Sequence, residues 1–148
     1  MTLMTDRKTK RKLMDGAIKT LVIPFLREQG FKGSMPHFRR IKKDRINLIT
    51  FQHSRHQTKF VVEIANCPPS GITTYWDEVI PEKRVTAQDV SRRLRLGSTG
   101  VGTDYWFDYT KESIFTNTYR RVAKEVLSNW EQAEKWWEEN PFEQENEG

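Results

Sequence analysis

The residues with the strongest potential for chemistry are charged and aromatic side chains that alternate with apolar ones. In residues 59–65, Glu63 has the opposite parity to the apolar positions 60, 62 and 64, so a strand would place it on the other face of a sheet. Arg93 and Arg95 alternate with leucines in the same way. If helices cover the apolar face, a polar face remains open. The binding residues predicted for this face are Arg39, His53, Glu63, Arg93, Arg95 and Trp106.

Arginine and aromatic side chains in this pattern favour binding of an anion. A guanidinium group matches the geometry of a carboxylate or a phosphate, and an aromatic ring can stack on a base. Cross-strand ion pairing on a solvated sheet face predicts the same residues. The pattern is therefore compatible with two interpretations: a binding site, or an ordinary set of surface charge pairs.

Motifs for catalysis, metal binding or cofactor binding are not found in this sequence. Cys67 is the only cysteine, which excludes an internal disulfide and a zinc site of several thiolates. His53 and His56 are separated by two residues around a predicted strand end, and a strand would place them on opposite faces. The glycine-rich residues 97–102 lack the lysine and the following helix of a phosphate-binding loop. We therefore expect no catalytic residue, no metal and no cofactor; the sequence favours a protein without enzymatic activity over an enzyme but leaves both open.

Charge is distributed unevenly along the chain. Residues 1–60 contain 15 Lys and Arg against 4 Asp and Glu, residues 61–110 contain 5 against 7, and residues 111–148 contain 5 against 9. A basic half can attract polyanions, but the two ends could also meet and neutralise each other. The longest apolar run, 21–26, is too short to span a bilayer. We expect a cytoplasmic protein with no membrane partner.

Helices are predicted at both ends of the chain. Apolar residues recur at three- and four-residue spacing over residues 6–29, with a kink or break expected before Pro24. A second helix is predicted over 111–139 with Thr110 as its N-cap. Because one straight helix of that length would exceed the size of the domain, it should bend near residues 128–129 or project. This helix could also pair with a copy of itself.

Between the helices, the sequence predicts an antiparallel meander of four to five strands. The expected strands are residues 31–41, 46–53, 59–65, 92–96 and, as an optional fifth, 105–109. The link between the third and fourth strands is predicted as a long connection with one helical turn at 86–89. The predicted fold is α+β, with one domain over 1–140 and a flexible acidic tail over 141–148.

Several short motifs of this chain occur together in a known family. They are Gln29-Gly30-Phe31-Lys32, His37-Phe38-Arg39-Arg40, the segment 47–54, Arg93-Leu94-Arg95-Leu96-Gly97 and Asp104-Tyr105-Trp106-Phe107. In these motifs the chain resembles the bacterial domain-of-unknown-function family numbered 4304, over most of its length up to about residue 110. The resemblance implies a bacterial cytoplasmic α+β domain. It carries over no catalytic residue, because the activity of the family is uncharacterised.

Three functions remain open from the sequence. The first is a non-enzymatic binding module, for example an immunity- or antitoxin-like inhibitor, that recognises an acidic protein or another anion. The second is nucleic-acid binding, although no helix-turn-helix, zinc-finger or RNA-binding signature is present. The third is a small enzyme that uses Glu63 or Asp104 as acid or base, aided by Arg95 and His53.

Overall fold

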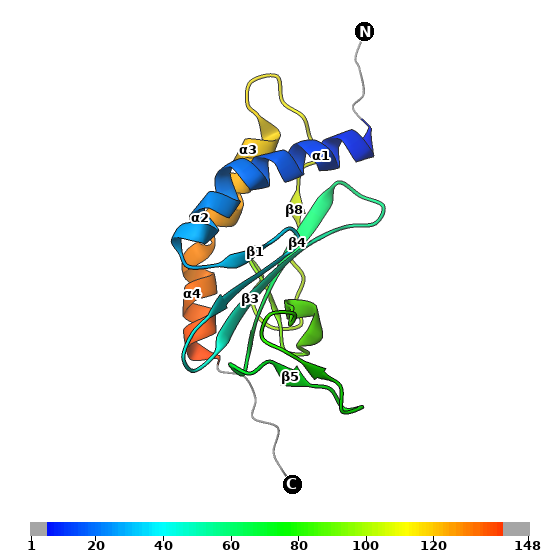
Figure 1. Ribbon diagram of the computed structural model, residues 1–148. Coiled ribbons are helices and arrows are strands. Elements are labelled where there is room, and N and C mark those ends of the chain that lie inside the picture. Colours follow the sequence, from blue (N-terminus) through cyan, green and yellow to red (C-terminus); the bar gives the residue numbers. More distant parts are fainter. Residues whose placement is uncertain (1–5, 141–148) are drawn as a thin grey trace.

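The computed structural model describes residues 6–140, and its fold is α+β, with helices covering one face of an antiparallel sheet (Figure 1). The predicted tail, 141–148, lies outside the described residues and stays a prediction. No helix within residues 6–140 combines the length and the apolar character needed to cross a bilayer.

The N-terminal helix is continuous but changes its hydrogen bonding before Pro24. It consists of α1 (Arg7–Ala17), the π-helical stretch η1 (Ile18–Val22) and α2 (Ile23–Glu28). Proline lacks an N–H donor and its ring clashes with the carbonyl four residues earlier, so the preceding turn widens. The predicted helix is confirmed, and the irregularity expected before Pro24 is present as a π-helical stretch and not as a break.

The sheet has six strands in an antiparallel arrangement. The strands are β1 (Lys32–Ser34), β2 (His37–Ile41), β3 (Ile46–His53), β4 (Lys59–Cys67), β7 (Leu94–Arg95) and β8 (Phe107–Asp108). Their order is β1-β2-β3-β4-β7, and β8 pairs with the start of β4. The predicted meander is confirmed with one correction. Residues 31–41 form two strands because Pro36, which has no N–H, lies in a turn between them.

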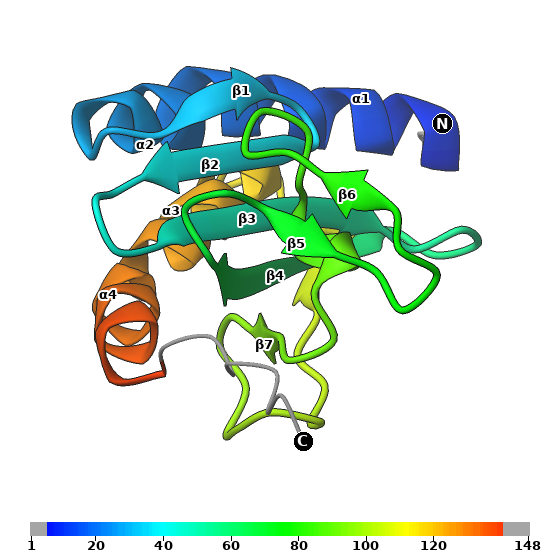
Figure 2. The same cartoon turned by 60° about the horizontal axis from the view of Figure 1, so that its bottom comes forward.

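The long connection between β4 and β7 covers part of the second face of the sheet (Figure 2). It forms a hairpin of β5 (Ile72–Thr73) and β6 (Val79–Ile80), which the sequence analysis missed, and the short 3₁₀ helix η2 (Ala87–Asp89). A capping box between Thr86 and Asp89 confirms the predicted helical turn. A small second core lies beneath this segment and contains Ile46, Leu48, Ala65, Cys67, Val85 and Ala87. Part of the face that was expected to be open is therefore covered by the chain itself.

The C-terminal helix bends where predicted but begins later. It consists of α3 (Thr118–Ser128) and α4 (Trp130–Glu139), with Asn129 between them. The Asn117 side chain accepts a hydrogen bond from the Arg120 N–H at 3.1 Å and is the N-cap. The prediction of Thr110 as N-cap is wrong, because its hydroxyl contacts that of Thr58 instead. Residues 110–117 form an exposed loop in which Ile114 is 93% exposed.

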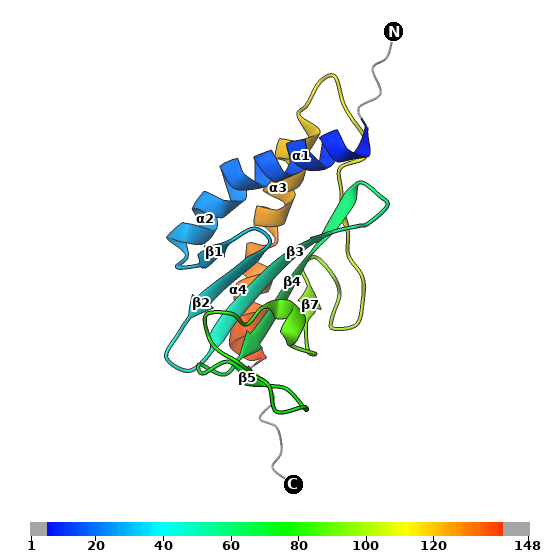
Figure 3. The same cartoon turned by 45° about the vertical axis from the view of Figure 1, so that its right-hand side comes forward.

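The main core lies between the helices and the sheet (Figure 3). Phe38, Phe51 and Phe60 project from three strands toward it and form aromatic contacts with one another. Trp137 on α4 is buried and donates a hydrogen bond from its indole nitrogen to the Ala65 carbonyl at 3.1 Å. The apolar side of the C-terminal helix, which includes Val122, Val126 and Trp137, is thus packed in the chain's own core.

Candidate functional site

Four of the six predicted binding residues lie together at the β4–β7 edge of the polar face. Glu63 on β4 is paired in register with Arg95 on β7. The Glu63 carboxylate lies 2.9 Å from the Arg93 guanidinium and 3.6 Å from that of Arg95. Arg95 also pairs with Asp104 at 2.7 Å. The Trp106 ring centre lies 5.3 Å from the guanidinium carbon of Arg95. The predicted gathering of Glu63, the two arginines and Trp106 is therefore present.

These contacts bury the Glu63 carboxylate. Glu63 is 5% exposed, whereas the side chains of Arg93 and Arg95 are 33% and 28% exposed. A buried carboxylate is costly unless opposite charge compensates it, and here two guanidinium groups do so. The arginines face the solvent and the carboxylate lies beneath them. The cluster therefore presents cations, already partly neutralised, to a partner.

A row of polar side chains crosses the sheet at the level of Glu63. The strand registers pair His37 with Thr50, Thr50 with Glu63, and Glu63 with Arg95. His37 Nδ1 lies 2.9 Å from the Thr50 hydroxyl. Burial and the nearby Arg39 guanidinium lower the pKa of His37, which favours the neutral imidazole. The sequence analysis missed His37 and Thr50, although His37 shares the parity of Arg39 in residues 37–41.

The other two predicted residues lie apart from this cluster. Arg39 is on the same face but beneath the segment before η2, where it donates to the Val85 carbonyl at 3.1 Å. The placement of His53 on the polar face is wrong, because it has the parity of the core-facing residues of β3. Its ring nitrogens lie 2.8 Å from an Asp15 carboxylate oxygen and 2.9 Å from the Tyr109 hydroxyl.

The chain of contacts through His53 connects three parts of the fold. Asp15 lies on α1, His53 ends β3, and Tyr109 directly follows β8. Burial raises the pKa of Tyr109 to about 12, so its hydroxyl keeps its proton and can donate to the His53 ring. Both ring nitrogens have partners, and Tyr109 is fully buried. The arrangement therefore accounts for His53 as a structural residue.

Cys67 is also placed as a structural residue. Its side chain is 1% exposed in the second core, and burial raises the pKa of its thiol to about 12. A protonated, inaccessible thiol is a poor nucleophile and a poor metal ligand. Within the described part of the chain, no group of three or more His, Cys, Asp or Glu side chains is arranged to hold a metal ion.

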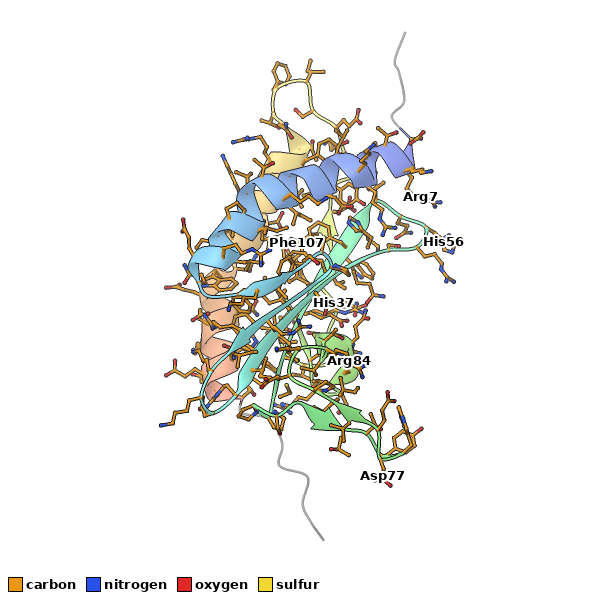
Figure 4. The ribbon with its side chains drawn as sticks, viewed as in Figure 1. Arg7, His37, His56, Asp77, Arg84 and Phe107 are labelled. Carbon is orange, nitrogen blue, oxygen red and sulfur yellow. The ribbon has the colours of Figure 1, made fainter. Side chains whose placement is uncertain are left out.

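A second set of cations, which is not among the six predicted binding residues, lines an open hollow at the end of the sheet. Figure 4 labels two of its residues, Arg7 and His56. The hollow has a volume of about 490 Å³ and lies between the start of α1, the β3–β4 turn and the end of β8. Its lining consists of Arg7, Lys10, His56, Gln57, Thr58, Lys59, Asp108 and Thr110. The basic residues at the start of α1 were a signal for this site in the sequence. The β3–β4 turn completes the hollow, and only the fold brings this turn next to the start of α1.

The cations of the hollow contact neutral oxygens. Arg7 donates to the His56 carbonyl at 2.8 Å, and Lys10 donates to the Thr110 carbonyl at 2.7 Å. Neither side chain pairs with a carboxylate among residues 6–140. A carbonyl fixes the position of a cation without cancelling its charge. The hollow therefore keeps a positive potential that the Glu63 cluster has largely lost.

Trp106 connects the hollow with the Glu63 cluster. Its ring centre lies 4.5 Å from the Lys59 ammonium and 5.3 Å from the Arg95 guanidinium carbon. Both distances allow attraction between a cation and the ring face. The two cation sets thus form one continuous surface, which we call the cationic surface. It consists of Arg7, Lys10, His56, Lys59, Trp106 and Arg95.

Comparison with known proteins places the chain in a family. No curated protein and no solved structure matches the chain. A family model described as "Domain of unknown function (DUF4304)" matches residues 22–140, which include every strand and both C-terminal helices. The match covers most of the chain and agrees with the resemblance of its short motifs. The chain therefore belongs to the DUF4304 family.

Proposed function

We propose that this protein is a non-enzymatic binding module that recognises an acidic protein through the cationic surface. An inhibitor of the immunity or antitoxin type is one concrete form. The observation that carries the proposal is the open hollow in which Arg7, Lys10 and Lys59 surround one carboxylate, that of Asp108. Cations grouped in a concave surface reinforce one another's field and attract opposite charge.

The contacts within the surface favour recognition over catalysis. Arg7 and Lys10 are held in place by carbonyl groups, so less side-chain freedom is lost when they bind a partner. Trp106 is half-buried between two cations and adds apolar area next to the charges. Arginine and tryptophan are the residue types that most often dominate binding energy at protein interfaces.

The acidic residues at the border of the surface favour a protein partner over a nucleic acid. Asp104 and Asp108 lie beside Arg95 and the hollow respectively. A phosphate backbone carries closely and regularly spaced negative charges, which these carboxylates would repel. A protein partner can place single carboxylates against the cations and avoid Asp104 and Asp108.

The proposal is tested by titrating the full chain into a fluorescent oligoglutamate peptide and, separately, an oligothymidylate of equal charge, with anisotropy as the readout. We expect binding of the peptide that weakens as salt is added. The double variant Arg7→Glu, Lys10→Glu should weaken it by about tenfold or more. The matched control is Lys19→Glu, Lys135→Glu, which makes the same charge change at exposed positions outside the hollow.

Three outcomes would contradict the proposal. The first is absence of peptide binding at low salt. The second is equal weakening by the control variant, which would mean that net charge and not the hollow governs binding. The third is tighter binding of the oligothymidylate than of the peptide, which would instead support the nucleic-acid alternative.

A further inference from the structure

The β5–β6 hairpin projects from the body of the protein and carries two exposed aromatic side chains at its tip (Figures 1 and 4). Tyr75 is 93% exposed and Trp76 is 58% exposed. Their rings meet edge to face with centroids 4.5 Å apart. These rings contribute little to the core of their own chain, although burial elsewhere would be favourable. The tip therefore has the composition of an anchor for another surface.

Hydrogen bonds within the tip hold this pair in place. Thr74 donates its N–H to the Glu78 carbonyl at 2.8 Å, and its hydroxyl accepts from the Glu78 N–H at 3.0 Å. The Trp76 indole nitrogen donates to the Glu78 carboxylate at 2.9 Å. At the hairpin base, a Cβ on Gly71 would overlap the Ile80 carbonyl oxygen, so the two strands approach as closely as glycine allows. A preorganised tip loses little conformational freedom when it binds.

The charge of the tip limits what it can bind. Asp77 and Glu78 follow the aromatic pair directly, and no basic residue lies between Ile72 and Ile80. An acidic tip is repelled by phosphate groups and attracted by cations. The tip thus has the chemistry that the cationic surface is proposed to bind: carboxylates beside aromatic rings.

We infer that the partner of the hairpin tip is the cationic hollow of a second copy of this chain. Arg7 and Lys10 would face the Asp77 and Glu78 carboxylates, and Trp76 would lie against the wall of the hollow. The tip and the hollow lie on the same side of the molecule in Figure 4, where Asp77 marks one and Arg7 and His56 mark the other. In the proposed dimer, a two-fold axis between them would bring each tip to the hollow of the other copy.

Such a dimer is closed and contains the same contact twice. Two-fold symmetric dimers are the commonest assemblies of identical chains, because one pair of complementary surfaces satisfies both copies. The contact involves one hairpin tip and one shallow hollow, so we expect a reversible, salt-sensitive dimer of the weak class. The inference rests on the proposed function in that it uses the same hollow, and an acidic partner would compete with the dimer.

Sedimentation equilibrium of the full chain at low and high salt tests the dimer. We expect a monomer–dimer equilibrium that shifts to monomer as salt is added. Tyr75→Ser, Trp76→Ser in the tip, and separately Arg7→Glu, Lys10→Glu in the hollow, should each weaken dimerisation by about tenfold or more. The matched control is Ile114→Ser, Phe115→Ser, which removes two side chains that are 93% and 89% exposed in the 110–117 loop. This control should dimerise as the unmodified chain does.

A charge exchange makes the test specific. Asp77→Lys, Glu78→Lys in one chain should weaken its self-association by about tenfold or more, as Arg7→Glu, Lys10→Glu should in another. Mixed together, the two variants should form a heterodimer, because one of its contacts has the original charges and the other has both signs reversed.

Several results would overturn the inference. They are a monomer at every concentration, undiminished dimerisation of the tip variant, equal weakening by the loop control, failure of the charge-exchanged pair to associate, and assembly beyond a dimer. The proposed function fails separately. If the oligoglutamate peptide binds the hollow but the chain stays monomeric, only the dimer is excluded. If the dimer responds to salt and to the tip and hollow variants as expected but the oligoglutamate peptide does not bind, only recognition of other acidic proteins is excluded.

Discussion

The polar face of the sheet contains a buried carboxylate that two arginines compensate. Glu63 is almost fully covered, and both of its arginine partners are about one-third exposed. The sequence pattern of Glu63, Arg93 and Arg95 was compatible with two interpretations, namely cross-strand charge pairing and a binding site. For Glu63 the contacts favour cross-strand charge pairing, because two arginines already compensate its charge. A binding site remains a hypothesis for the cations around Trp106.

The replacement Glu63→Gln tests the role of this carboxylate. The variant leaves two guanidinium groups without their shared counter-charge, so the free energy of unfolding should fall by about 1–3 kcal/mol. Urea denaturation followed by circular dichroism measures this change. Asp104→Asn is the control, because the Asp104 side chain is 72% exposed and its pair with Arg95 should contribute at most about 0.5 kcal/mol. Equal effects of the two variants would mean that Glu63 is not the centre of the cluster.

At the scale of elements, the start of the C-terminal helix depends on the side-chain contacts of Thr110 and Thr118. The sequence predicts Thr110 as the N-cap, whereas the structure has the N-cap seven residues later, at Asn117. In the fold, Thr110 is held at Thr58, and the Thr118 hydroxyl donates to the Lys111 carbonyl at 2.8 Å, which closes the loop at its base. The helix therefore begins at Thr118, and the loop before it is exposed.

We predict that Asn117→Ala lowers the free energy of unfolding by about 1 kcal/mol, because the Arg120 N–H loses its side-chain acceptor. Thermal denaturation measures the loss, and amide hydrogen exchange in the first turn of α3 should rise with it. Thr116→Ala, one position earlier and exposed, provides the comparison. A larger effect at Thr116 than at Asn117 would contradict this assignment of the cap.

At the scale of the whole molecule, tryptophans have two distinct roles. Trp137 is buried where α4 meets the sheet, and Phe31 and Trp130 pack against its ring. Trp76 projects from the far hairpin. Composition gives both residues the same apolar weight, but the three- and four-residue spacing of apolar residues in 119–137 favours burial of Trp137 only. The fold shows that Trp137 is buried and that Trp76 is exposed.

Replacement by alanine at these two positions should separate the roles quantitatively. Trp137→Ala removes a large buried side chain and should lower the free energy of unfolding by about 3–5 kcal/mol. Trp76→Ala should change it by no more than about 0.5 kcal/mol, because its neighbours at the tip are exposed. Urea titrations of both variants provide the measurement. A strongly destabilised Trp76 variant would show that the tip supports the fold, and the association data could then not be interpreted as loss of a docking surface.

The sequence alone is enough to predict the α+β class, the three central strands, the helix irregularity before Pro24 and the bend near Asn129. Each of these depends on local signals: apolar periodicity, proline and turn chemistry. Strand parity also placed Glu63, Arg93 and Arg95 on one face, because side chains alternate regularly along a strand.

Which surface stays exposed depends on tertiary packing. The connection between β4 and β7 covers part of the polar face, and His53 faces the helices because the register of β3 against β4 sets its side. The cationic hollow joins residues about fifty and a hundred positions apart. Such proximity depends on how the elements pack, and packing reflects burial summed over the whole chain, which a local pattern does not contain.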